Sequence, residues 1–248
     1  MKKEQIALQL YSIRKQCEQN LAQTLKTVSD IGIKRLELAG LNNHTAEDFR
    51  NIIDSFGQVA IAAHISLDDL LYKYEQTVSD YKTLGTKYLI VPWINPEQSA
   101  TALLCQKNAE IMMLLNEKLA RDGFALGFHN HWIEFDPHFE DGSYPWTIYT
   151  KTGIVAELDI AWCHRGKHLA TEEIAKLPNT CKLLHVKDIS FSDLKAQVVG
   201  EGDLNWSEII SCADSNNVEY FVIEVESWDD DRLGGVIRSY TNLLKYVS

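Results

Sequence analysis

Short apolar runs rich in β-branched residues alternate along the chain with amphipathic segments of helical period. The first kind of run is typical of strands buried on both faces and the second of helices, so their alternation indicates repeated βαβ units. Eight runs are strand candidates: residues 5–10, 35–38, 59–64, 88–93, 125–131, 155–160, 183–187 and 220–226.

The helical segments between the strands have recognisable ends. Thr45 is a candidate N-cap for a stripe that runs from Phe49 to Phe56, and Gly57 ends this segment. Further apolar stripes cover residues 21–28, 67–78, 111–119, 206–213 and 236–243, with a weaker helix over 144–150. Eight strands alternating with helices predict an α/β protein, a single (β/α)8 TIM barrel over residues 1–248, with an open doubly wound sheet as the alternative.

Charge and composition narrow the range of partners. The 248 residues carry a formal net charge of −11, which argues against binding to nucleic acid or to anionic membranes, because both require a positive surface. No apolar stretch approaches the roughly 18 residues of a membrane span, and no signal peptide is evident. The five cysteines are scattered without a C-x-x-C motif, so we expect a reduced, cytoplasmic protein.

Polar residues recur two positions apart in the last four predicted strands. The pairs are His129 and His131, Glu157 and Asp159, His185 and Lys187, and Glu224 and Glu226. Each pair shares one face of its strand, and in a barrel functional groups gather where the strands end. The first four strands are mostly apolar, with isolated polar groups at Gln9, Glu37 and His64. Polar groups are therefore concentrated on one half of the barrel mouth.

A cluster of buried carboxylates requires a cation, because each uncompensated ion costs several kcal/mol. Carboxylates together with an imidazole suit a divalent metal ion such as Mn²⁺, Mg²⁺, Co²⁺ or Zn²⁺, and oxygen-rich ligation favours the harder ions. A single strand-end His or Glu is often only structural, but four adjacent strands with the same pattern favour the metal. The alternation of side chains along the strand leaves open whether Glu157 belongs to the site or lies deeper as a structural residue.

Several segments together carry a resemblance to a known family. They are L-Q-L-Y-S-I-R at 8–14, F-H-N-H-W-I-E-F at 128–135, E-L-D-I-A-W at 157–162, L-H-V-K-D at 184–188, V-G-E-G-D-L-N-W at 199–206 and V-I-E-V-E at 222–226. As an ordered set they resemble the xylose-isomerase-like TIM barrel superfamily, and within it the sugar phosphate isomerase/epimerase branch.

The resemblance implies a metal ion held by a Glu, Asp, His, Glu quartet, with one ligand from each of strands five to eight. The residues that match the last three positions are Asp159, His185 and Glu224. Many relatives place the first glutamate within strand five, where this chain has His129 and His131. Glu134 is the available carboxylate and is assigned as the first ligand, with one of the two histidines as the alternative.

The remaining polar and aromatic groups at the strand ends have expected roles in catalysis and binding. His131 is the candidate acid/base, and Glu37 on the opposite wall is a candidate second base. The candidate substrate-binding residues are Lys187, Glu226, His64, Trp93 and Trp162, and Trp132 and Trp228 also follow strands.

The loop at 200–203 lacks the pattern of a phosphate-binding loop. We interpret it as a turn in which Asp203 caps the next helix. No cluster of lysines or arginines marks a phosphate site either, so an unphosphorylated sugar is favoured as the small-molecule substrate.

The predicted reaction is metal-dependent proton transfer next to a carbonyl of a keto or aldo sugar, catalysed by an isomerase or epimerase. A lyase of the same barrel type, an inosose dehydratase or a 3-keto-glycoside eliminase, is the main alternative. A non-catalytic sugar-binding subunit is another. An abasic-site endonuclease of the superfamily is disfavoured by the negative charge. The sequence leaves the oligomeric state open, including a homo-oligomer.

Overall fold

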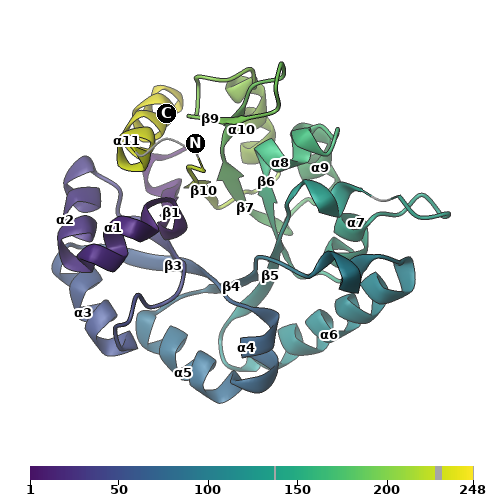
Figure 1. The fold of residues 1–248 in the computed structure, drawn as a ribbon, viewed down its shortest axis with the longest axis horizontal. Helices are drawn as coiled ribbons and strands as arrows, with labels where there is room; N and C mark the ends of the chain where they lie inside the picture. The colour runs from purple at the N-terminus through teal and green to yellow at the C-terminus, as the bar shows by residue number, and fades with distance from the viewer. Residues whose placement is uncertain (137, 227–230, 248) are drawn as a thin grey trace.

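Eight parallel strands close into a barrel in the computed structural model, which describes residues 1–136, 138–226 and 231–247 (Figure 1). The order around the barrel is β1-β10-β7-β6-β5-β4-β3-β2, so strands consecutive along the chain are neighbours in space. The barrel strands are β1 (Ile6–Gln9), β2 (Arg35–Leu38), β3 (Val59–His64), β4 (Tyr88–Val91), β5 (Ala125–His129), β6 (Val155–Asp159), β7 (Cys181–Val186) and β10 (Tyr220–Ile223). The predicted (β/α)8 architecture is confirmed.

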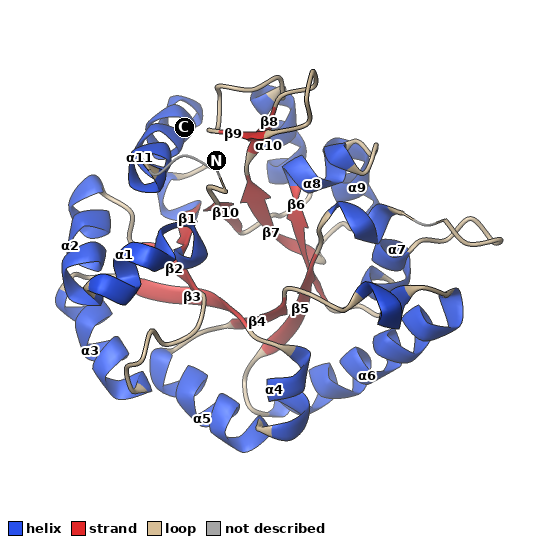
Figure 2. Cartoon of the chain, viewed as in Figure 1, coloured by secondary structure: helices blue, strands red, loops and turns tan. Residues whose placement is uncertain are grey.

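Helices surround the barrel on its outside (Figure 2). They are α1 (Arg14–Gln19), α2 (Leu21–Ile31), α3 (Ala46–Ser55), α4 (Leu67–Tyr72), α5 (Tyr74–Leu84), α6 (Ala102–Arg121), α7 (Pro145–Thr150), α8 (Ile160–Arg165), α9 (Ala170–Lys176), α10 (Trp206–Ser215) and α11 (Arg232–Leu243). Short 3-10 turns complete the set at Lys3–Gln5, Leu10–Ile13, Pro96–Ser99, Trp132–Phe135 and Leu244–Tyr246. Among the described residues, no helix is long and apolar enough to cross a membrane.

The structure corrects some predicted element boundaries. The stripe over 67–78 is divided at Lys73, whose non-helical backbone separates α4 from α5. β5 ends at His129 and β10 at Ile223, earlier than predicted, because pairing with the neighbouring strands ends there. The residues that follow these strands form the mouth of the barrel. Asn205, and not Asp203, is the N-cap of α10, since its side chain accepts from the backbone N–H of Glu208.

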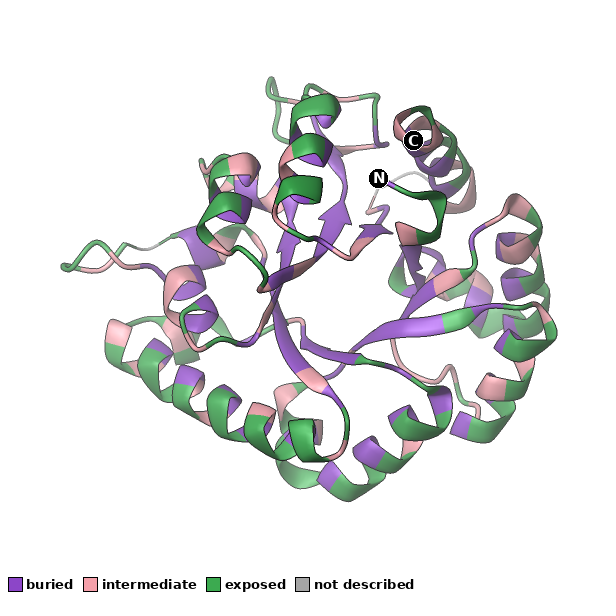
Figure 3. Cartoon of the chain, turned by 180° about the vertical axis from the view of Figure 1, so that it is seen from behind, coloured by how far each residue is buried: buried purple, intermediate pink, exposed green. Residues whose placement is uncertain are grey.

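Alternation along the strands separates two environments. Outward residues such as Leu126 and Phe128 pack against the helices, and the strands are buried along most of their length (Figure 3). Inward residues form an apolar lower layer of Ala7, Ile61, Ala62, Tyr88, Ile90, Leu183 and Val222. Gly127 lies on this inner face, where a Cβ atom would overlap the side chain of Ile90. The absence of a side chain there lets β5 pass over the lower layer and place His129 above it.

The connection after β7 is organised around the buried carboxylate of Asp188. This connection contains a small antiparallel hairpin, β8 (Asp188–Ile189) with β9 (Ala196–Gln197). Asp188 Oδ2 accepts from the Gly200 N–H at 2.8 Å and from the Trp206 indole N–H at 2.7 Å. Its Oδ1 accepts from the N–H groups of Ile189 and Leu204, at 2.9 and 3.2 Å. The 200–203 loop therefore wraps around an internal carboxylate of the protein.

We expect Asp188→Asn to lower the free energy of unfolding by about 2–4 kcal/mol, because charge-assisted bonds are lost and an amide N–H₂ group faces other donors. Urea unfolding followed by circular dichroism measures the change. Asp193→Asn, the same exchange at an exposed position of the hairpin loop, is the matched control and should change the unfolding free energy by less than about 0.5 kcal/mol. Equal effects of the two substitutions would contradict the role of Asp188.

Candidate functional site

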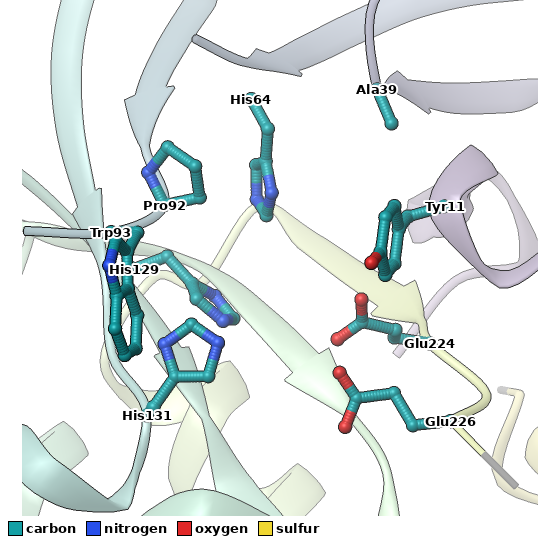
Figure 4. A pocket seen from close by; sticks show the side chains of 9 residues that line it. All are labelled: Tyr11, Ala39, His64, Pro92, Trp93, His129, His131, Glu224 and Glu226. Carbon is teal, nitrogen blue, oxygen red and sulfur yellow. The ribbon is translucent and has the colours of Figure 1, made fainter. Parts of the chain in front are cut away.

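A cavity of about 460 Å³ opens at the mouth of the barrel, where the parallel strands end (Figure 4). Its lining residues follow or end strands β1 to β5 and β10: Tyr11, Ala39, His64, Pro92, Trp93, His129, His131, Glu224 and Glu226. Four of these nine residues are predicted site residues from the last four strands or their connections. Part of the predicted set therefore lines one cavity, which has the size of a small-molecule site.

The buried polar side chains beneath the cavity form what we call its floor, which is centred on the carboxylate of Glu157. Its Oε2 atom lies 2.7 Å from His64 Nε2, 3.1 Å from His129 Nδ1 and 3.2 Å from His185 Nε2. Burial alone would raise the pKa of Glu157, but the imidazoles of His185 and His64 outweigh burial and hold the pKa well below its usual range. Glu157 is thus fully buried beneath the cavity, where it contacts two of the histidines that line it, His64 and His129.

His185 contacts carboxylates through both ring nitrogens. Its Nε2 lies 2.7 Å from Glu37 Oε2, and its Nδ1 lies 3.1 Å from Glu224 Oε2. The side-chain amide of Gln9 donates to Glu37 Oε2 at 2.8 Å. Burial opposes a charge on this imidazole, but Glu157, Glu37 and Glu224 together raise the pKa of His185 well above its usual value.

Glu37 does not take the position expected of a second base. It is fully buried, it does not line the cavity, and its carboxylate lies behind His185, held by Gln9. Burial, reinforced by the charge of Glu157, raises the pKa of Glu37 to about 7. The geometry thus gives Glu37 the role of orienting His185.

Lys187 supplies the positive charge at the other side of the floor. Its buried ammonium lies 3.0 Å from Asp159 Oδ2, 2.9 Å from Glu224 Oε2 and 2.9 Å from Glu226 Oε2. Burial would lower the pKa of this lysine, but the three carboxylates outweigh it and raise the pKa. Burial raises the pKa of Asp159 to about 6, and the Lys187 charge opposes that rise.

Three of the four predicted metal ligands come together. Asp159, His185 and Glu224 each offer a ligand atom, and with His129 these atoms all lie within 4.8 Å of one another. The strand register explains this, because Asp159 pairs with His185 across β6 and β7. His129 ends β5 on the same inward face and pairs with Glu157. In this group His129 stands in place of Glu134, and it is one of the two histidines that the sequence offered as the alternative.

The structure does not bring Glu134 to this group. Its Oε2 accepts from the backbone N–H of His131 at 2.7 Å, at the start of the 3-10 turn Trp132–Phe135. Glu134 borders a separate small cavity of about 50 Å³ beside Ile94. Its position three residues past His131 places it in the turn after the strand, where it satisfies a backbone donor.

The chemistry of this donor set, two imidazoles and two carboxylates, fits a divalent cation. Next to the set, Glu157 Oε1 and Glu37 Oε1 are buried without a hydrogen-bond partner, although a carboxylate oxygen removed from water requires one. Burial, followed by the charge of His185, holds the pKa of His129 well below its usual value, so its imidazole is neutral and has a free lone pair. Neutral imidazoles and carboxylates are the ligands of Mn²⁺, Co²⁺ and Zn²⁺.

His131 lies in the cavity wall as a neutral base. Burial, followed by the charge of Lys187, lowers its pKa to about 4. Its Nδ1 atom has no hydrogen-bond partner, and its ring packs edge-on against Trp93 with centroids 5.1 Å apart. An unprotonated imidazole without a partner can accept a proton from a bound molecule.

Two aromatic rings border the entrance. Trp93 is 47% exposed, and Tyr11, which is 45% exposed, lies under the Arg14 guanidinium. The role of Tyr11 was not predicted, although it lies in the L-Q-L-Y-S segment directly after β1. Trp162 does not line the cavity. Its ring lies 5.0 Å from Lys187 Nζ and supports the buried ammonium.

Two other tryptophans follow predicted strands in the sequence. Trp132 is 39% exposed and lies 5.6 Å from the Arg165 guanidinium, outside the cavity lining. Trp228 lies outside the described residues.

Several solved protein structures have the same fold as this chain. No protein-family model and no curated protein matches the chain. A sugar phosphate isomerase/epimerase from Parabacteroides distasonis matches with a TM-score of 0.83 and 23% identity over 97% of each chain. A xylose isomerase domain containing protein from Salmonella typhimurium matches at 0.72 and 11% identity, over 99% of this chain and 96% of that chain.

The probable 3-DHS dehydratase AsbF from Bacillus anthracis also matches, with a TM-score of 0.72 and 14% identity over 98% of this chain and 99% of that chain. Proteins with this fold therefore include a named isomerase/epimerase and a probable dehydratase. The expected (β/α)8 TIM-barrel fold is confirmed, and these solved structures share it.

The geometry predicts which substitutions remove a bound ion. Asp159→Asn and His129→Ala should lower manganese affinity by at least about tenfold, because each removes a ligand of the proposed set. Glu134→Gln should leave manganese affinity within about threefold, since this carboxylate binds a backbone N–H. Electron paramagnetic resonance of free Mn²⁺ during titration measures all three. Loss of the ion in Glu134→Gln with retention in His129→Ala would restore Glu134 as the ligand.

Proposed function

We propose that this protein is a divalent-metal-dependent sugar isomerase or epimerase whose active site is the cavity at the barrel mouth. The observation that carries the proposal is the group of His129, Asp159, His185 and Glu224 on the floor of a cavity whose wall presents the neutral imidazole of His131. A divalent cation held by these four residues would bind neighbouring oxygens of a sugar and stabilise negative charge on them.

The lining of the cavity suits an uncharged, hydroxyl-rich molecule. Of the described lining residues, none is a lysine or arginine, which disfavours a phosphorylated substrate. Glu226 is 27% exposed at the mouth and can accept from hydroxyl groups, while its contact with Lys187 fixes its direction. The rings of Trp93 and Tyr11 offer flat faces for the C–H surface of a sugar.

The placement of the bases favours isomerisation over epimerisation. His131 faces the cavity, whereas Glu37 is held behind His185. Epimerisation requires proton removal from one face of a carbon and return to the other, for which two opposed bases serve best. One base can move a proton between two neighbouring carbons on the same face, which interconverts an aldose and a ketose.

A lyase is the second candidate, and the same observation supports it. A single base beside a metal-bound carbonyl can also remove a proton while a β-substituent leaves, as an inosose dehydratase or a 3-keto-glycoside eliminase requires. The structural match to a probable dehydratase is consistent with such chemistry on this fold. In a non-catalytic binding subunit, the third alternative, the same cavity would bind sugar without proton exchange.

Proton exchange distinguishes these reactions. Metal-loaded protein is incubated with unphosphorylated aldoses and ketoses, inososes and 3-keto-glycosides in deuterated water and followed by NMR. Deuterium incorporation with formation of an isomeric sugar supports the proposal. A new enone or a released aglycone would assign the lyase instead, and binding without exchange or product would leave only the binding role.

His131→Asn should lower turnover of the substrate by about 100-fold or more, because the proton acceptor is lost. Manganese affinity should stay within about threefold of the original protein, since His131 is outside the proposed ligand set. His138→Asn, at an exposed position, is the matched control and should retain full turnover. Unchanged turnover in His131→Asn would remove this residue from the mechanism.

A further inference from the structure

The floor of the cavity contains two overlapping groups of side chains able to hold a metal ion. The outer set is the group discussed above, His129, Asp159, His185 and Glu224. The inner set is His64, His129, Glu157 and His185, whose ligand atoms also lie within 4.8 Å of one another. The two sets share His129 and His185, and each adds two residues of its own.

The inner set is a compact arrangement of three nitrogens around one oxygen. His64 Nε2, His129 Nδ1 and His185 Nε2 surround Glu157 Oε2 at 2.7 to 3.2 Å. Glu157 is fully buried, and its other oxygen, Oε1, has no hydrogen-bond partner. A buried carboxylate with an unpartnered oxygen and three ring nitrogens within reach has the donors that a cation requires.

Fixed positive charge is divided unequally between the two sets. The Lys187 ammonium pairs with both carboxylates of the outer set, at 3.0 Å from Asp159 and 2.9 Å from Glu224. In the described part of the chain, no lysine or arginine pairs with Glu157 or Glu37. The inner carboxylates are thus the ones without a permanent cation, and buried charges of this kind are costly unless compensated.

As a neutral imidazole, His185 can offer a lone pair to only one of the two sets. Its Nδ1 faces Glu224 and its Nε2 faces Glu37 and Glu157. A neutral imidazole has a lone pair on one nitrogen and a proton on the other. An ion on one side therefore leaves an N–H on the other side, which donates to the carboxylate there and fixes the ring.

We propose that the inner set is a second divalent-cation position, which takes nitrogen-preferring ions such as Zn²⁺ and excludes an ion from the outer set. The inner set has three imidazoles and one carboxylate, whereas the outer set has two imidazoles and two carboxylates. The inner set is therefore richer in nitrogen, and imidazole ligation suits zinc. Zinc bound there would withdraw His129 and His185 from a harder ion in the outer set. This inference rests on the proposed function only for the role of the outer set.

A matched pair of substitutions tests the proposal by ion binding alone. Glu157→Gln and Asp159→Asn remove one carboxylate each, two residues apart on the same face of β6. Chelator-treated protein is titrated with Zn²⁺ against a competing fluorescent chelator, and with Mn²⁺ by electron paramagnetic resonance. We expect Glu157→Gln to weaken Zn²⁺ by at least about tenfold and Mn²⁺ by less than about threefold, with the reverse pattern for Asp159→Asn.

His64→Gln is the second variant for the inner set. His64 lines the cavity and, unlike His129, belongs to the inner set alone. This variant should show the same ion-binding pattern as Glu157→Gln. It serves as the test if near-ultraviolet circular dichroism shows that Glu157→Gln does not fold. Equal weakening of both ions in inner-set and outer-set variants would overturn the proposal, because it would mean one shared site. If the protein keeps its bound Mn²⁺ while it binds one equivalent of Zn²⁺, then zinc in the inner set does not exclude an ion from the outer set, and that part of the proposal is wrong.

Failure of the proposed function has a different signature. The ion-binding pattern would then be as expected, while no sugar of the panel exchanges a proton or forms a product. Conversely, the protein could isomerise a sugar and bind zinc and manganese through the same residues. The proposed function would then be correct and the proposed inner cation position would be wrong.

Discussion

The upper half of this barrel depends on the compensation of buried negative charge. Glu37, Glu157, Asp159 and Glu224 converge on one floor, and none of them is more than marginally exposed. Lys187 compensates the carboxylates on one side, and the imidazoles of His64 and His185, whose pKa values the carboxylates raise, compensate those on the other. Because an unpaired buried ion costs several kcal/mol, these side chains have little freedom to move independently of one another. The floor therefore acts as one electrostatic unit, in which His185 links the two sides.

The alternation of inward and outward side chains along each strand allows part of this unit to be predicted from the sequence. A strand sends alternate residues into the lumen, so the sequence alone predicts that Asp159, His185 and Glu224 lie together. Barrel closure and the strand number were predicted from a different pattern, the alternation of strand-like and helical runs along the chain. The fold was predictable because eight buried runs separated by helical stripes admit few arrangements.

The parts that could not be predicted depend on side-chain direction and on where pairing ends. Glu134 was assigned from its residue type, but β5 ends at His129, and the turn that follows directs Glu134 to a backbone N–H. Glu37 points into the lumen, as a base in the cavity would, yet its hydrogen bonds to Gln9 and His185 hold it outside the cavity lining. Such outcomes depend on contacts between residues far apart in sequence, which no local pattern contains.

The apolar lower layer of the lumen has a further consequence for traffic through the barrel. Tyr88, Ile90, Leu183 and their neighbours fill the interior beneath the polar floor, and Tyr88 is fastened at its far end to Glu219. Among the described residues, packed side chains of this kind close the lumen beneath the polar floor to an ion with its hydration shell. The proposed metal ion and the proposed sugar would therefore enter from the same end of the barrel. A sugar bound above the ion would slow the exchange of that ion with solvent.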